Sequence, residues 1–300
     1  MKIATIVVDK QEVASIITDY GYLPISVINE RYNKDWPYDL FTLLTEDVLE
    51  DIKQWYNSTD SSSYEKLELC MPQESVKFAP LYRRPRKIWG IGLNYKAHAD
   101  TLSERLPDSE PASFMKPDTT IIGYGDTIKI PELSQKTTGE AELALIFGKK
   151  CKNVSRKDWR SVIAGFTSII DMTAEDILKR NPRNLTQAKS FDTFFSFGPV
   201  FYTLDEAEDL FTLSVRTVIN GKVHAENVVA NMTFPLDFLV SYHSRIMTML
   251  PGDIISTGTP GATPIKDGDM IECRMGDFQP LLNHIVDLKL EKEKKNIRGT

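Results

Sequence analysis

The segment spanning residues 139–147, Gly-Glu-Ala-Glu-Leu-Ala-Leu-Ile-Phe, places two acidic residues at the start of a strongly apolar run. Side chains alternate between the two faces of a β-strand, so Glu140 and Glu142 share one face with Ala144. The other face is apolar at each of its positions, and a strand with two apolar faces is typically buried on both sides. Any fold of this chain must therefore place carboxylates beside a core strand.

A third acid, Asp171, closes the apolar run 163–170. Unpaired carboxylates beside a dry strand are costly or take up a proton, so a positive group is expected between the three acids. A divalent cation fits best, because Mg²⁺ and Mn²⁺ prefer carboxylate oxygens and no Cys or His spacing suggests zinc. Alternatively, the two glutamates are solvated at a strand end or pair with Lys149 or Lys150. The predicted metal ligands are Glu140, Glu142 and Asp171.

The overall charge restricts the class of partner. A net charge of −6 gives no support to a nucleic-acid or anionic-membrane partner. The basic patch at 83–87 is interpreted as a solvated linker. The chain shows neither a signal peptide pattern nor a long apolar stretch, and its three cysteines are scattered. These features predict a cytoplasmic protein with reduced thiols and a small-molecule partner.

The chain divides into three predicted parts: a small N-terminal domain (1–84), a main domain (85–290) and a charged tail (291–300). In the first part, strands are expected at 3–8 and 23–28, followed by a helix that Thr45 caps.

From residue 87 onward the pattern is β-rich, and a hairpin is expected at Asn220-Gly221. Short helices are expected to begin at Ser155 and near Pro235. The fold class is therefore mainly β with some α+β elements. The strands expected in the main domain are 88–93, 127–130, 143–147, 163–170, 199–202, 213–219, 253–256 and 270–274.

Six motifs of the main domain occur in a fixed order. They are Gly92-Leu-Asn-Tyr-Lys-Ala-His98, Phe114-Met-Lys-Pro117, Gly139-Glu-Ala-Glu-Leu143, Asp171-Met-Thr-Ala174, Ala188-Lys-Ser-Phe-Asp-Thr193 and Thr257-Gly-Thr-Pro260. Together they resemble the fumarylacetoacetate hydrolase family over roughly residues 87 to 285. The resemblance implies a β-sandwich roll with a small N-terminal α+β domain, usually a homodimer. It also implies a metal held by Glu-x-Glu on one strand and Asp on another, which here are Glu140, Glu142 and Asp171.

The resemblance further implies a substrate and a mechanism. Family members act on 2-oxo or 2,4-dioxo acids with Mg²⁺ or Mn²⁺. Lys189 would supply positive charge to the substrate carboxylate and enolate, and Thr259 and Lys116 would bind substrate. His98 would be the general base, since a neutral imidazole can take a proton from water. Water would attack C4, the C3–C4 bond would break, and the cation would stabilise the departing pyruvate enolate.

One departure from the family pattern concerns the base. Many relatives carry Glu three residues after the His, where it orients the imidazole, but this chain has Thr101. Asp100 and Glu104 are possible substitutes, and Glu104 is the candidate retained.

A second departure surrounds the metal Asp. Where relatives commonly show Asn, Arg and Gln, this chain has Ile170, Glu175 and Leu178. An acid in place of a substrate-binding Arg favours a smaller or less anionic substrate. Glu175 could instead pair with Lys179 or Arg180 on its own helix.

Three hypotheses follow for the function. The first is a metal-dependent hydrolase that cleaves a C–C bond in an acylpyruvate or fumarylacetoacetate type of acid. The second is an isomerase, tautomerase or decarboxylase acting on a 2-oxo acid such as oxaloacetate, which needs no hydrolytic water. The third is a non-catalytic metal-binding homologue.

Overall fold

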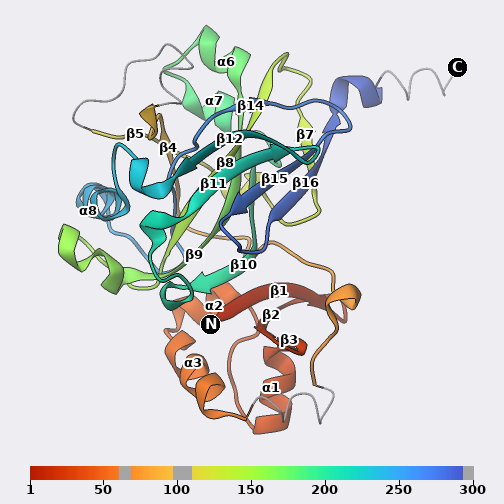
Figure 1. Cartoon of the computed structure of the whole chain (residues 1–300), viewed down its shortest axis with the longest axis vertical. Helices are drawn as coiled ribbons and strands as arrows, with labels where there is room; N and C mark the ends of the chain where they lie inside the picture. The colour runs from red at the N-terminus through yellow and green to blue at the C-terminus, as the bar shows by residue number, and fades with distance from the viewer. Residues whose placement is uncertain (61–68, 97–109, 293–300) are drawn as a thin grey trace, which may run out of the picture.

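The computed structural model describes residues 1–60, 69–96 and 110–292, and two β-sheets dominate it (Figure 1). The larger sheet has the order β3 (Gly21–Pro24), β2 (Gln11–Thr18), β1 (Lys2–Val8), β10 (Phe195–Thr203), β9 (Ile163–Ala174), β8 (Thr137–Phe147), β13 (Ile254–Ser256), β4 (Ile88–Gly92) and β5 (Ala112–Met115). The smaller sheet has the order β12 (Lys222–Val228), β11 (Ser214–Ile219), β15 (Met270–Met275), β16 (Leu281–Asp287) and β7 (Thr127–Ile130). Strands β11 and β15 pack on β8, which makes the two sheets a sandwich. The predicted mainly β fold class is confirmed.

Short strands and helices complete the fold. Two short strands pair with the larger sheet: β6 (Ile121–Ile122) with β10, and β14 (Thr263–Pro264) with β8. The α-helices of the described residues include α1 (Ile25–Tyr32), α2 (Leu40–Thr45), α3 (Leu49–Ser58), α6 (Glu175–Arg180), α7 (Leu185–Lys189) and α8 (Leu236–Ile246), and residues 288–292 are helical as well. The 3₁₀ segments are Gln73–Ser75, Asp118–Thr120, Arg156–Val162, Leu204–Glu206, Leu210–Thr212 and Val229–Asn231. Within the described ranges, no helix has both the length and the apolar character needed to cross a membrane.

Strand β8 is buried along its whole length, as its sequence predicts. The residues at 141, 143, 145 and 147 belong to the core that lies between the two sheets. Ala144 and Ile146, on the other face, belong to a second core that includes Ile3 and Leu43 of the N-terminal segment. The face that carries Glu140 and Glu142 thus continues into this second core.

The acidic residues lie inside strands rather than at strand ends. Strand β8 begins six residues before the predicted 143–147, and β9 continues beyond residue 170 to Ala174. Each strand can continue through its acidic residues because the buried carboxylates form hydrogen bonds and ion pairs with neighbouring groups. The expected hairpin at Asn220-Gly221 is present, with both residues at positive φ (51° and 79°).

The N-terminal segment joins the larger sheet, because β1 pairs antiparallel with β10 (Figure 1). The predicted strand 23–28 is wrong in its second half: the chain turns into α1 after Pro24, and Ile25 and Ile28 are buried on one helical face. Thr45 ends α2 instead of capping the next helix, whose first residue is Leu49. The predicted domain division remains a prediction.

Two helix starts in the main domain differ slightly from expectation. Ser155 precedes a 3₁₀ helix (Arg156–Val162) and donates a hydrogen bond to Asp158. Pro235 is the N-cap of α8 rather than a residue of its first turn.

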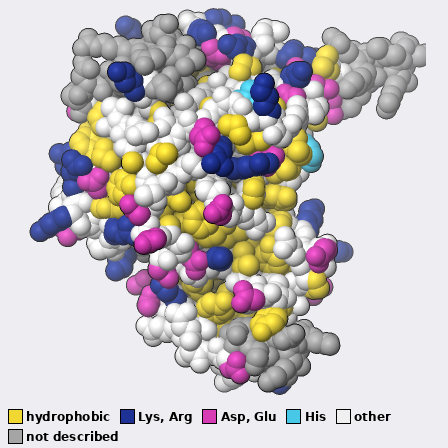
Figure 2. Space-filling model, viewed as in Figure 1, with side chains coloured by type: hydrophobic (Ala, Val, Ile, Leu, Met, Phe, Trp, Pro, Cys, Tyr) yellow, Lys and Arg dark blue, Asp and Glu magenta, His cyan; other side chains and the backbone are white. Residues whose placement is uncertain are grey.

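On the face of the molecule drawn in Figure 2, basic and acidic side chains are interspersed.

Candidate active site

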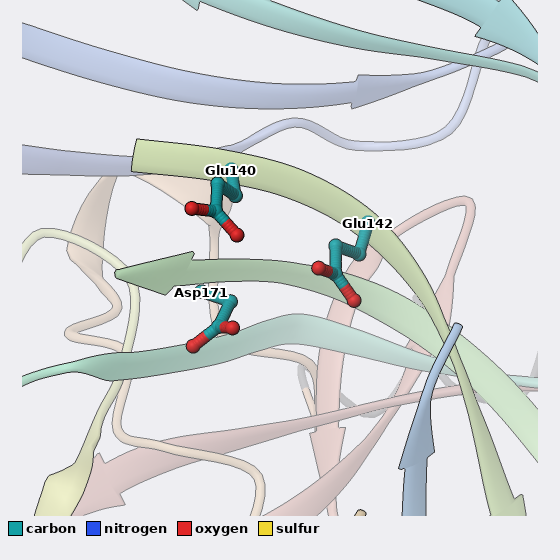
Figure 3. A group of neighbouring side chains, drawn as sticks. All are labelled: Glu140, Glu142 and Asp171. Carbon is teal, nitrogen blue, oxygen red and sulfur yellow. The ribbon is translucent and has the colours of Figure 1, made fainter. Parts of the chain in front are cut away.

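Strands β8 and β9 bring the three predicted metal ligands together. Their antiparallel register places Glu140 directly opposite Asp171, and Glu142 follows on the same face of β8. One carboxylate oxygen from each residue lies within 4.8 Å of the others, and Figure 3 shows the three side chains grouped together on β8 and β9. All three residues are buried.

Two buried lysines neutralise part of this charge. Lys189, the last residue of α7, places Nζ 2.9 Å from Glu140 Oε2 and 2.6 Å from Asp171 Oδ2. Lys116, which follows β5, places Nζ 2.5 Å from Asp171 Oδ1. The alternative in which the glutamates are solvated or pair with Lys149 or Lys150 is therefore wrong. Those two lysines follow the far end of β8, away from the acids.

Hydroxyl groups complete the surroundings of Glu140. Its Oε1 accepts hydrogen bonds from Thr138 and from Thr173, at 3.0 Å and 2.5 Å. Thr138 precedes Glu140 by two residues, so the strand period puts both side chains on one face. Sequence reasoning missed these threonines, although the spacing of Thr138 carried the signal.

The turn after β13 holds Glu142. Glu142 Oε2 accepts hydrogen bonds from Ser256 Oγ and from the Gly258 backbone N–H, the latter at 2.8 Å. Gly258 has φ +98°, and a Cβ there would lie 2.8 Å from the Asn94 Cβ. Asn94, buried in the first motif, donates from Nδ2 to the carbonyls of Phe234 and Thr257. The first motif (residues 92–98) and the last motif (residues 257–260) are therefore in contact next to Glu142.

Protonation differs among the charged groups. Burial, followed by the charge of Asp171, raises the pKa of Glu142 to about 8. Burial acts against ionisation of Asp171 as well, but Lys116 and Lys189 outweigh it and lower the pKa of that carboxyl. Burial opposes the charge on Lys189, yet Asp171 and Glu140 raise its pKa. For Lys116 burial prevails, and its pKa is lowered.

The residues present fit a divalent cation. The donor set is three converging carboxylates, the hard oxygen ligands that Mg²⁺ and Mn²⁺ prefer. The two lysines pair with Asp171 and Glu140, and burial raises the pKa of Glu142, which has a hydroxyl group and a backbone N–H as its partners. Bound cationic charge would favour the ionised form of that acid. The cluster could therefore hold a metal ion.

A cavity of about 250 Å³ opens onto this cluster. Its described lining includes Glu140 and Lys189, with residues of α6 and α7 on one side and of β5 and the end of β4 on the other. Glu175 lies at the cavity and pairs with Lys136 and Lys179, at 2.6 Å and 2.5 Å. The pairing with Lys179 considered from the sequence is thus present, and these lysines lower the pKa of Glu175 against the effect of its burial.

The remaining predicted site residues have different outcomes. The Thr259 hydroxyl lies in a turn, where it donates to the Gly261 carbonyl and accepts from its N–H, at 3.2 Å and 3.3 Å. Lys116 contacts Asp171 and is not among the described residues that line the cavity. Substrate contacts for both stay predictions. His98 and Glu104 lie outside the described residues.

Comparison with known proteins identifies the family. The family model described as fumarylacetoacetate (FAA) hydrolase C-terminal matches residues 87–286. The mitochondrial oxaloacetate tautomerase Fahd2a of Rattus norvegicus is 32% identical over 224 residues, which cover 72% of this chain and 71% of that protein.

Two solved structures share the fold. The 5-carboxymethyl-2-hydroxymuconate delta-isomerase from Mycobacterium smegmatis is 26% identical with a TM-score of 0.74, covering 96% of this chain and 99% of that one. Maleylpyruvate hydrolase from Sphingobium sp. SYK-6, solved with manganese(II) and pyruvate, is 24% identical with a TM-score of 0.75, at the same coverage of 96% and 99%. The second likeness shows the fold alone. The resemblance seen in the sequence is confirmed: the chain belongs to the fumarylacetoacetate hydrolase family.

Proposed function

We propose that this protein is a divalent-metal-dependent hydrolase that cleaves a C–C bond in a 2,4-dioxo acid of the acylpyruvate or fumarylacetoacetate type. The observation that carries the proposal is the buried cluster of three carboxylates and two lysines at a small cavity. Such a cluster can bind the oxygens of a 2-oxo acid and lower the energy of the enolate that forms when the C–C bond breaks.

The proposed roles follow from the contacts. Glu140, Glu142 and Asp171 would hold Mg²⁺ or Mn²⁺, and the bound ion would polarise the carboxylate and 2-oxo oxygens of the substrate. Lys189 lines the cavity, and its ammonium group supplies positive charge where the substrate oxygen becomes negative. Lys116 holds Asp171 in its ionised form through a direct ion pair.

The proposed base is His98, with Glu104 as the acid that orients it. Gly92 and Leu93 precede these residues in the chain and Ala112 follows them, and all three line the cavity. With an acylpyruvate as substrate, His98 would take a proton from water, the resulting hydroxide would add at C4, and the C3–C4 bond would break to give a carboxylic acid and pyruvate enolate. Protonation at C3 would then give pyruvate.

The second candidate is an isomerase, tautomerase or decarboxylase acting on a 2-oxo acid such as oxaloacetate. The observation in its favour is the 32% identity to an oxaloacetate tautomerase over most of the chain. This reaction class needs the same enolate stabilisation but no hydrolytic water. Both candidates place the substrate at the same cluster.

Turnover of acetylpyruvate and of oxaloacetate, each with and without Mg²⁺ or Mn²⁺, tests the two candidates. We expect metal-dependent release of pyruvate from acetylpyruvate, and Glu142→Gln should abolish metal binding with little loss of fold. Metal-dependent conversion of oxaloacetate alone would favour the second candidate. No turnover of either acid would favour a non-catalytic homologue.

Assembly and location also belong to the proposal. We expect a homodimer, which light scattering of the purified protein tests, and a cytoplasmic location, which fractionation of cells tests.

A further inference from the structure

We propose that the cavity selects a 2-oxo acid with a single carboxylate and a short apolar tail, and discriminates against acids that carry a second carboxylate at the far end. This inference rests on the proposed function, which orients the 2-oxo acid end of the ligand toward the carboxylate and lysine cluster. It narrows that function to the acylpyruvate type, because fumarylacetoacetate carries a second carboxylate at its far end.

Among the described residues that line the cavity, positive charge lies at one end. Lys189 is the one cation among the described residues that line it, and it lies beside Glu140. Lys189 is itself paired with Glu140 and Asp171, but under the proposed function a bound Mg²⁺ or Mn²⁺ adds positive charge there. A ligand can therefore place one carboxylate near the cluster.

The wall that faces the rest of the ligand is apolar. Helices α6 and α7 contribute Leu178 and Leu185, with Pro182 between them, and β5 contributes Ala112. A carboxylate against this wall would lose water without gaining a described hydrogen-bond donor. A short hydrocarbon tail would instead gain from leaving water.

The two lysines that contact Glu175 are already paired. Glu175 also lines the cavity, and its two carboxylate oxygens bind Lys136 and Lys179. Both lysines are largely exposed, at 48% and 66%, so their charge is screened by solvent as well. A second ligand carboxylate would meet the negative charge of Glu175 rather than a free cation.

The volume limits the tail to a few carbon atoms. A cavity of about 250 Å³ is smaller than the pockets that usually enclose drug-sized ligands. The selected substrates are thus small acylpyruvates or 2-oxo acids that end in a methyl, propyl or isopropyl group.

Binding of two matched ligands tests this selectivity without any turnover. The first probe is 2-oxoglutarate, and the second is the 2-oxo acid in which an isopropyl group replaces its distal carboxylate. Titration calorimetry with Mg²⁺ present should show the isopropyl acid binding on the order of tenfold more tightly, since an unpaired charge is costly in an apolar site. Equal or tighter binding of 2-oxoglutarate, or no binding of the isopropyl acid, would overturn the inference.

Variants of residues that line the cavity test which side chains cause the selectivity. Leu178→Arg places a cation on the wall and should shift the preference toward 2-oxoglutarate by about tenfold relative to the unchanged protein. The matched control is Leu133→Arg, at a leucine that is 64% exposed and does not line the cavity, and it should leave the preference unchanged. Glu175→Gln, which frees Lys136 and Lys179, should improve 2-oxoglutarate binding in the same direction. An unchanged preference in both cavity variants would contradict the inference.

The outcome separates this inference from the proposed function. If acetylpyruvate is not cleaved but the isopropyl acid binds more tightly, the hydrolase proposal fails and the selectivity holds. If acetylpyruvate is cleaved but 2-oxoglutarate binds more tightly, the selectivity fails and the hydrolase proposal holds.

Discussion

Glu140 and Asp171 face each other across the β8–β9 strand pair, and the ammonium group of Lys189 bridges them. A single cation from α7 thus neutralises charge on two strands at once. The arrangement offsets part of the cost of burying two acids in the interior of a sheet, and it ties helix α7 to the centre of the fold.

Lys189→Met should destabilise the metal-free protein, because it leaves two buried carboxylates without their shared partner. Removing one member of a buried ion pair usually costs about 3 to 5 kcal/mol. Urea denaturation measures this loss, and added Mg²⁺ or Mn²⁺ should restore part of it. The control is Lys292→Met, whose lysine is 64% exposed and pairs with Glu132. That variant should change stability by at most about 1 kcal/mol, and a similar loss in both variants would contradict the prediction.

Metal affinity should rise with pH up to about pH 8, where Glu142 loses its proton. Below that value the cation must displace this proton, so affinity should fall about tenfold for each pH unit. Calorimetry in buffers of different ionisation enthalpy should detect release of about one proton per ion near pH 7.

The same group gives the metal-free protein a pH-dependent stability. The ordinary value of 4.5 for Glu142 rises to about 8 in the folded chain, so between these values the folded state holds a proton that the unfolded state releases. Stability from this group is therefore complete below pH 4.5 and is lost as the pH rises through about 8. Glu142→Gln should flatten this slope, and an unchanged slope would show that another group causes it.

Gly258→Ala should destabilise the fold more than Gly268→Ala, although both glycines have positive φ, +98° and +83°. A Cβ at Gly268 meets nothing within 4 Å, whereas one at Gly258 lies 2.8 Å from the Asn94 Cβ. Backbone strain should cost about 1 to 3 kcal/mol at either position. Steric overlap should add about 1 to 3 kcal/mol at Gly258. Urea denaturation compares the two, and metal affinity should fall only in the Gly258 variant, since its N–H binds Glu142.

Asn94→Ala should leave the Phe234 and Thr257 carbonyls and the Phe234 N–H without their side-chain partner. Buried polar groups left unsatisfied cost about 1 to 3 kcal/mol each, so the total should reach about 3 kcal/mol or more. Asn231→Ala is the control, since that residue is exposed. An equal shift of the thermal denaturation midpoint in both variants would rule out a special role for Asn94.

Local pattern was enough to predict that two of the carboxylates share one face of a buried strand. The period of two placed Glu140 and Glu142 on one side of a buried strand, and the structure keeps them there. The ordered motifs pointed to Asp171 and Lys189, which lie beside them. The sequence did not predict the register between β8 and β9. This register sets Asp171 opposite Glu140, and it depends on contacts between residues that lie far apart in the chain.

Strand β16 shows why other elements escaped prediction. Its residue Asn283 is polar yet fully buried, because its amide donates to the carbonyls of Gly123 and Asp126. A polar residue at a core position breaks the alternation by which a strand is recognised. The compensating partners lie about 160 residues away, as the chain separations of 160 and 157 show, so no local window contains them.

Strand β8 separates two hydrophobic cores, because its alternate residues pack against different parts of the molecule. The carboxylates stand on the face opposite to the one on which β11 and β15 of the small sheet pack. Their contacts with Lys116, Lys189 and Ser256 are made on this face. A search for variants of the proposed metal site can therefore begin with these contacts and leave the core between the two sheets intact.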